Sequence, residues 1–228
     1  MANRCHTING TSTKTLKPKK FNGTSWVDCP TYRFTSSSSV ERMDKQLVTK
    51  TEVISGYPQW NGSWRNSSGS GTASYHRSDN IYQGKYDSYH YIGLMCFTDL
   101  FAKARAKGTI TKVTLRLKNN HAYYNSGLTT RVCGAHSLPS TRPSSVSFSW
   151  GGTTAFSSDV SFDKNASTPK TITLNSTAIS QIQNNQVNGF RLLSPTGFTL
   201  SNYGYFDGST NSSIRPYCEL TVQYQVWE

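Results

Sequence analysis

Aromatic rings that lie among amide and small polar side chains are the groups in this sequence best suited to binding chemistry. They occur in the segments 57–71 and 119–127, which are rich in Asn, Gly and Ser, a composition typical of loops. A sugar ring has an apolar C–H face that an aromatic ring can cover, and hydroxyl groups that an amide can bind. The candidate glycan-binding residues on these predicted loops are Trp60, Trp64, Tyr123, Tyr124 and Asn125.

The same rings also have a structural interpretation, in which they cover the ends of a hydrophobic core. A third aromatic segment, which contains Tyr203, Tyr205 and Phe206, directly precedes the last predicted strand, and this position favours the structural role there. For the rings of the other two segments the sequence leaves both interpretations open.

The sequence does not indicate catalysis or metal binding. It contains no H-E-x-x-H, G-x-S-x-G or Walker motif. Its 12 acidic residues are widely spaced, so isolated surface carboxylates are a simpler interpretation than the facing pair that glycoside hydrolysis requires. The five histidines lack ligand spacing, and no Asp-rich calcium loop occurs. We therefore expect no catalytic residue, no metal and no cofactor.

The cysteines give no sign of a zinc site or a disulfide framework. Five are present, and no two of them form a C-x-x-C pair. The first residues lack the apolar segment of a secretory signal, so we expect a reducing compartment and free thiols. Cys218 falls on the apolar side of an alternating segment, which predicts a small buried side chain.

The composition favours strands and turns. Hydrophobic residues make up 35% of the 228 residues and charged residues 16%, and Ser, Thr and Asn fill much of the remainder. No run of about 18 apolar residues is present, so no membrane-spanning helix is expected.

The net charge of +12 is concentrated toward the start of the chain. A basic patch with an expected anchoring role consists of Lys14, Lys17, Lys19 and Lys20. Such a patch can attract an anionic cell-wall polymer or an acidic protein, and it can equally be a solvated arm. No zinc-finger, helix-turn-helix or RNP-like motif occurs, so nucleic acid is not an expected partner.

Alternating apolar and polar residues predict an all-β domain over residues 48–228. The predicted strands lie at 73–86, 89–97, 113–118, 128–135, 146–150, 171–174, 189–192 and 218–226. The segments 98–108 and 176–182 read instead as short helices, the first with a capping residue at its start and a Gly at its end. This pattern predicts a jelly-roll-like β-sandwich with helical crossovers.

A different organisation is predicted before residue 48. Residues 1–15 have no hydrophobic period and read as an N-terminal arm. Residues 16–47 contain an internal repeat in which Lys20–Asp28 aligns with Arg33–Glu41. Asn22-Gly23 is typical of a two-residue hairpin turn, so each copy is predicted to be a small hairpin that must pack on a neighbour.

The segment Phe21-Asn22-Gly23-Thr24-Ser25-Trp26-Val27 resembles the short F/Y-N-G-x-x-W-V hairpins of minor structural and tail proteins of phages that infect Gram-positive bacteria. In those proteins the hairpins often occur in tandem and precede a sandwich module. Further similar stretches are Tyr82–Tyr86, Ile110–Val113, His121–Gly127, Tyr203–Phe206 and Arg215–Tyr217. The second hairpin departs from the pattern, because Ser36 and Ser39 replace the Gly and the Trp.

The resemblance implies a virion protein of the tail, baseplate or a fibre that adsorbs to host cell-wall polysaccharide through a jelly-roll carbohydrate-binding module. The N-terminal region would then contact other virion proteins, and the chain would form a homo-oligomer, a trimer by analogy with phage fibres. The resemblance also implies that the protein belongs to a virion assembled in the host cytoplasm. One alternative is a purely structural virion protein without glycan binding, such as a head decoration, neck or fibre protein, and another is a wall-degrading hydrolase.

Overall fold

The computed structural model describes residues 19–21, 23–28, 32–36, 39–42, 47–123, 126–164, 166–195, 197–198 and 202–228. The chain divides into two compact units, one of residues 1–48 with 225–228 and the other of residues 49–224. The predicted arm at residues 1–15 lies outside the described residues, as do Lys14 and Lys17 of the basic patch. Lys19 and Lys20 lie in strand β1 (Lys19–Phe21).

The N-terminal unit contains the two predicted hairpins. Strand β1 pairs with β2 (Trp26–Asp28), and β3 (Tyr32–Ser36) pairs with β4 (Ser39–Arg42). Gly23 has a φ of +98°, as expected for a turn glycine. However, Phe21 pairs with Trp26, so four residues connect the first two strands. The prediction of a two-residue turn was therefore wrong, although the prediction of a hairpin was right.

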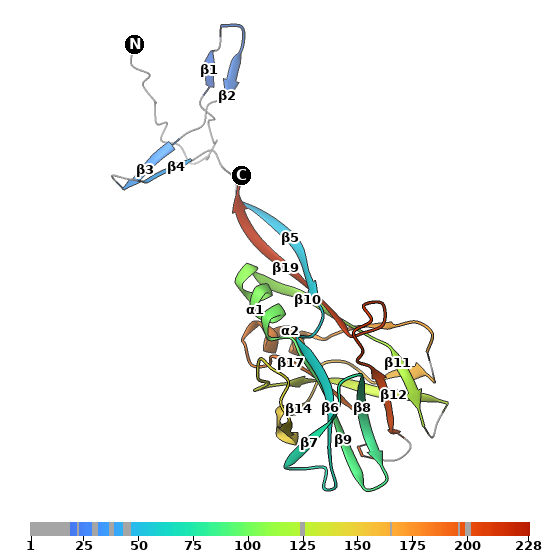
Figure 1. Ribbon diagram of the computed structural model, residues 1–228. Helices are drawn as coiled ribbons and strands as arrows, with labels where there is room; N and C mark the ends of the chain where they lie inside the picture. Colours follow the sequence, from blue (N-terminus) through green and yellow to red (C-terminus); the bar gives the residue numbers. More distant parts are fainter. Residues whose placement is uncertain are drawn as a thin grey trace. The chain divides into compact units, whose positions relative to one another are not determined.

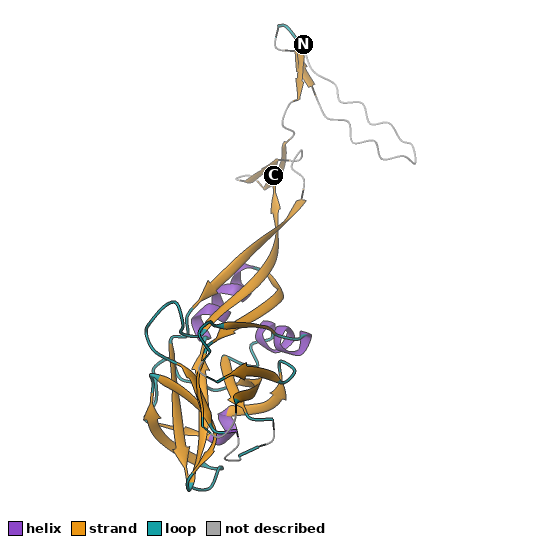
Figure 2. Cartoon of the chain, turned by 90° about the vertical axis from the view of Figure 1, so that its right-hand side faces the viewer, coloured by secondary structure: helices purple, strands orange, loops and turns teal. Residues whose placement is uncertain are grey.

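The larger unit contains two antiparallel sheets that contribute to one principal core (Figures 1 and 2). The smaller sheet has the order β16 (Lys170–Thr173), β10 (Thr109–Leu117), β19 (Tyr217–Trp227) and β5 (Leu47–Gly56). On β10 and β19 every second residue points to one face, which packs on the core. The buried residues on this face are Val113, Leu115 and Leu117 of β10, and Cys218, Leu220 and Val222 of β19. The alternating strands predicted at these positions, and the buried position of Cys218, are confirmed.

Strand β9 (Tyr89–Cys96) is central to the larger sheet. It pairs along one edge with β6 (Trp60–Asn66) and along the other with β8 (Asn80–Tyr86) and then β17 (Gly189–Leu193). The main path of the sheet is β11 (Asn119–Ala122), β18 (Gly204–Asp207), β8, β9, β17, β12 (Gly127–Ala135) and β14 (Gly151–Ala155). The remaining strands are β7 (Thr72–Arg77), which pairs with β6 and β13 (Ser145–Ser147), and β15 (Val160–Asp163), which pairs with β12.

The two predicted helices are confirmed as α1 (Thr98–Lys107) and α2 (Ser176–Gln183). The Asn175 side chain caps α2 by accepting a hydrogen bond from the Ala178 amide at 3.0 Å. The N-cap of α1 is Phe97, whose side chain makes no capping hydrogen bond, so the prediction of a capping residue at the start of this helix was wrong. Instead the Asp99 amide donates to Gln59 Oε1 at 3.1 Å, so a residue distant in sequence satisfies the helix start.

The structure confirms the predicted all-β sandwich and corrects two of its predicted strands. Residues 73–86 were predicted to be one strand, but they form β7 and β8, with Ser78 and Asp79 between them. Residues 146–150 were predicted to be a strand, but Phe148–Trp150 form a 3-10 helix between β13 and β14. Ser147 caps this helix, because its Oγ accepts a hydrogen bond from the Ser149 amide at 3.2 Å. Within the described part of the chain no helix is long and apolar enough to cross a membrane.

Candidate functional site

Trp60 and Trp64 lie in strand β6 and are 7% and 0% exposed, so the prediction that they are loop residues that stack on sugar is wrong. Their rings pack edge to face in a second hydrophobic core, with the ring centroids 5.6 Å apart. Their indole nitrogens donate to the carbonyl oxygens of Pro139 at 2.8 Å and Pro143 at 3.2 Å. Both tryptophans are therefore core residues.

The polar residues around these tryptophans explain the error. Asn61 and Ser63 belong to the ladder with β9, although such residues are common in turns. Asn61 Nδ2 donates to the Ser78 carbonyl at 2.7 Å, and Ser63 Oγ donates to the Asn80 carbonyl at 2.8 Å. These bonds satisfy buried polar groups, so a strand with loop-like composition remains stable inside the sheet.

Tyr123, another predicted candidate, is 40% exposed and directly follows strand β11. It belongs to a continuous set of aromatic rings with centroids 4.3 to 6.3 Å apart. We call this set the tyrosine face, and its members are His76, Tyr82, Tyr86, Tyr91, His121, Tyr123, Tyr203 and Tyr205. The other two candidates from the same segment, Tyr124 and Asn125, lie outside the described residues.

The tyrosine face has a buried base and an exposed rim. Tyr82, Tyr91 and Tyr203 are buried and form the base. At the rim, Tyr86 is 41% exposed and stacks on Tyr203 with centroids 4.8 Å apart and a 21° angle between the ring planes. The centroid of the Tyr123 ring lies 4.6 Å from that of the Tyr203 ring. The base therefore fixes the orientation of the rings that reach solvent.

Gly84 permits this arrangement. It lies on β8 between Tyr82 and Tyr86 with a φ of +82°, a conformation that residues other than glycine rarely adopt. A Cβ atom at this position would lie 2.5 Å from the Asn202 carbonyl oxygen and 2.9 Å from Tyr203 Cα. The absent side chain therefore allows the backbone before β18 to pass directly over β8 and place Tyr203 in the base.

The charge and protonation of the face suit a polar, neutral or anionic ligand. Burial raises the pKa of Tyr82 to about 12 and also raises the pKa of Tyr203 and Tyr205, so their hydroxyl groups remain protonated at neutral pH. Arg65 Nη1 donates to the Tyr91 hydroxyl at 3.3 Å, and the Arg77 guanidinium lies 6.0 Å from the Tyr82 ring centroid. Two cationic side chains thus border the rings.

His76 provides a test of this environment. Burial, together with the charges of Arg65 and Arg77, lowers its pKa from 6.5 to about 4, and Asp79 partly opposes the shift. The folded state therefore favours the neutral imidazole. Because the folded pKa lies below the unfolded one, the stability from His76 is complete above about pH 6.5 and decreases as the pH falls toward 4.

We expect an NMR titration of the folded protein to show the His76 imidazole protonating near pH 4. The variant Arg77→Gln should raise this midpoint, because it removes one repelling charge and leaves Asp79. A midpoint near 6.5 in the unsubstituted protein would contradict the described packing.

In the part of the chain that the structure describes, the other titratable groups form no cluster comparable to the tyrosine face. Among the described residues, no group of three or more His, Cys, Asp or Glu side chains is placed to hold a metal ion. Cys96, Cys133 and Cys218 are buried free thiols, and burial raises the pKa of each. The thiolate form is therefore disfavoured at all three.

Sequence reasoning found one member of the tyrosine face and missed most of the others. The spacing of Tyr82 and Tyr86 on one predicted strand, with Tyr91 on the next, was an available signal, because these positions lie on nearby strands of a hairpin. Tyr203 and Tyr205 were interpreted as core residues, and the structure places Tyr203 in the buried base. A scan of the sequence against protein-family models finds no match, and a search of curated proteins finds no similar sequence.

Proposed function

We propose that this chain is a virion protein of a bacteriophage tail, baseplate or fibre, and that it attaches the particle to its host by binding cell-wall polysaccharide at the tyrosine face. The observation that carries the proposal is the exposed rim of Tyr86 and Tyr123 on a buried base of stacked rings. Aromatic rings held in fixed positions cover the C–H faces of sugars, and neighbouring polar groups bind their hydroxyls.

Two further properties support the proposal. The net charge of +12 favours approach to the anionic polymers of Gram-positive walls, although salt screens this attraction beyond about 10 Å at 0.1 M. The tandem hairpins within residues 16–47 resemble those of phage tail proteins and would join the chain to the particle or to sister subunits.

Co-sedimentation with purified cell walls of Gram-positive bacteria tests the proposed binding. We expect the protein to sediment with intact walls of its host and to remain in solution when the wall polysaccharide has been removed chemically. Equal binding to stripped walls, or no binding to any wall, would contradict adsorption through polysaccharide.

Antibody labelling of intact phage particles tests the proposed location independently. Label at the tail tip or fibre supports the proposal. Label on the particle combined with no wall binding would instead favour a purely structural virion protein, in which a neighbouring subunit covers the tyrosine face.

A further inference from the structure

A second surface of the larger unit contains a pocket with a volume of about 700 Å³. Its wall is formed by the turn at residues 69–71, the 3-10 helix, strand β14 and the end of β17. No residue of the tyrosine face lines it. This volume lies in the range of pockets that hold small molecules.

The pocket contains a buried arginine. Arg191 lies on β17, paired with Leu94 of β9 and Cys133 of β12, and is 5% exposed. Its Nη1 donates to the Gly151 carbonyl at 2.8 Å. Its Nε is buried, and no group in the described part of the chain accepts its hydrogen. A guanidinium has five N–H donors, so this one retains unused binding capacity.

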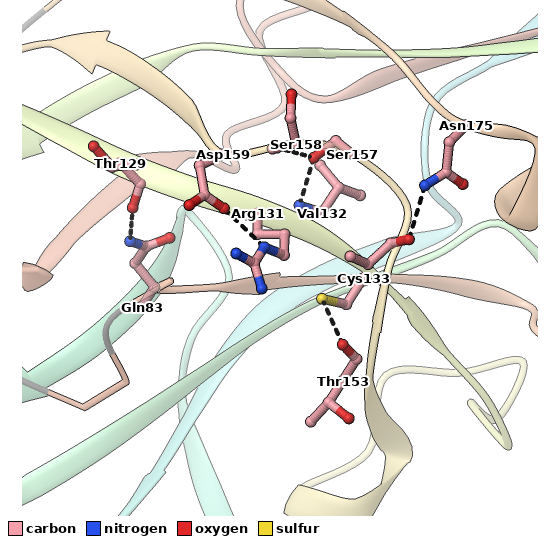
Figure 3. Close-up of polar contacts among 11 residues, drawn as sticks. Gln83, Thr129, Arg131, Val132, Cys133, Thr153, Ser157, Ser158, Asp159 and Asn175 are labelled. Carbon is pink, nitrogen blue, oxygen red and sulfur yellow. Dashed lines mark hydrogen bonds and ion pairs between the residues drawn. The ribbon is translucent and has the colours of Figure 1, made fainter.

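No described carboxylate compensates the charge of Arg191. The pocket lining contains no Asp or Glu, and Cys133 is the one titratable side chain that contributes to the electrostatics of Arg191. Burial raises the pKa of the Cys133 thiol, so Cys133 is neutral at physiological pH. A buried cation without a counter-charge is costly, and an anion that enters the site removes part of this cost. By contrast, Arg131 on the neighbouring strand pairs with Asp159 at 2.7 Å (Figure 3).

The rest of the wall packs closely against the Arg191 side chain at Gly151 and supplies polar groups elsewhere. Glycines are frequent in it, and a Cβ on Gly151 would lie 2.4 Å from Arg191 Cδ. The hydroxyls of Ser147 and Ser149 lie 2.7 Å apart at the 3-10 helix. Thr153 also lines the pocket, and its carbonyl oxygen accepts a hydrogen bond from Cys133 Sγ at 3.7 Å, which links β14 to β12 (Figure 3).

We propose that this pocket binds an oxyanionic group, a phosphate or a carboxylate, of a polyol- or sugar-sized ligand, with Arg191 as its principal contact. The planar guanidinium donates to an oxyanion through N–H groups that Gly151 does not use, and the serine hydroxyls contact the polar body of the ligand. This site is separate from the tyrosine face, so it does not depend on the function proposed above.

Isothermal titration calorimetry with the full chain tests the proposal, with glycerol 3-phosphate and glucuronate as anionic probes and glycerol as the neutral probe. We expect binding of at least one anion and none of glycerol. A response to glycerol phosphate alone identifies phosphate as the preferred group, and a response to glucuronate alone identifies carboxylate. Binding of no anion, or equal binding of glycerol, would overturn the proposal.

Three variants test whether the anion binds in this pocket. Arg191→Met should weaken anion binding by more than about tenfold, because it removes the charge and the donors. Since Arg191 is buried and its replacement could impair folding, Ser149→Glu provides a second route: it places a negative charge at an exposed position of the lining and should also abolish anion binding. Arg131→Gln removes an equal charge outside the pocket and should leave the affinity within about twofold of the original. Unchanged affinity in Ser149→Glu, or an equal loss in Arg131→Gln, would refute the assignment.

Discussion

A chain with alanine in place of both Tyr86 and Tyr123 is expected to bind cell-wall polysaccharide roughly thirtyfold more weakly than the unsubstituted protein. Each ring contributes about 1 kcal/mol when it stacks on an apolar face, so the loss of both costs about 2 kcal/mol, which corresponds to roughly thirtyfold in affinity. The two rings are the exposed members of a set whose base is buried, so they are the part that a sugar can reach. The affinity would be measured with soluble polysaccharide released from the wall.

Tyr57→Ala is the matched control for this double variant. Tyr57 is 37% exposed and contacts Tyr217 and Arg215, so it has a similar exposure outside the tyrosine face. We expect its removal to leave polysaccharide affinity unchanged. If Tyr57→Ala weakens binding as much as the double variant does, the binding surface is not the tyrosine face.

Trp64→Ala is expected to lower the free energy of unfolding by about 3–5 kcal/mol, the usual cost of replacing a buried large aromatic residue with alanine. The Trp64 ring is completely buried, packs against Trp60 and Tyr75, and donates a hydrogen bond to the Pro143 carbonyl. Its removal leaves a cavity in the second core and an unpaired carbonyl group. Urea denaturation followed by circular dichroism measures the change.

Two further measurements distinguish a structural role of Trp64 from a role in glycan binding. Tyr75→Ala, which removes an exposed neighbour of the same ring, should cost less than about 1.5 kcal/mol. At a temperature where Trp64→Ala is still folded, its affinity for polysaccharide should equal that of the unsubstituted protein. A stable Trp64→Ala variant that has lost polysaccharide binding would restore the interpretation of this residue as a glycan contact.

Local patterns were sufficient to predict three of the four strands of the smaller sheet, β10, β16 and β19, and both helices, whereas β5 was not predicted. In β19 the alternation of apolar and polar residues matches the alternation of buried and more exposed side chains. In β10 the apolar positions Val113, Leu115 and Leu117 are buried as predicted, and the polar Thr114 between them is buried as well. In α2 the capping residue and the buried positions Ala178 and Ile182 are close in sequence. These elements are therefore determined mainly by residues close together in the sequence, and they can be predicted from it.

The tyrosine face could not be predicted because its members come from distant parts of the chain. Tyr82, Tyr123 and Tyr203 meet only because β8 pairs with β18 and β18 with β11. Sequence alone gives strand positions and not which strands are neighbours. The core position of Trp64 was missed for a similar reason, because the polar residues beside it are satisfied by groups 17 positions away.

Strand β9 links the two proposed binding surfaces. It is paired along both edges, carries Tyr91 into the base of the tyrosine face, and pairs with Arg191 through Leu94. A strand held on both sides belongs to the part of a protein that opens only with global unfolding. We therefore expect Tyr91 and Arg191 to be ordered before a ligand arrives, so that binding at either surface requires little additional loss of conformational entropy at these two residues.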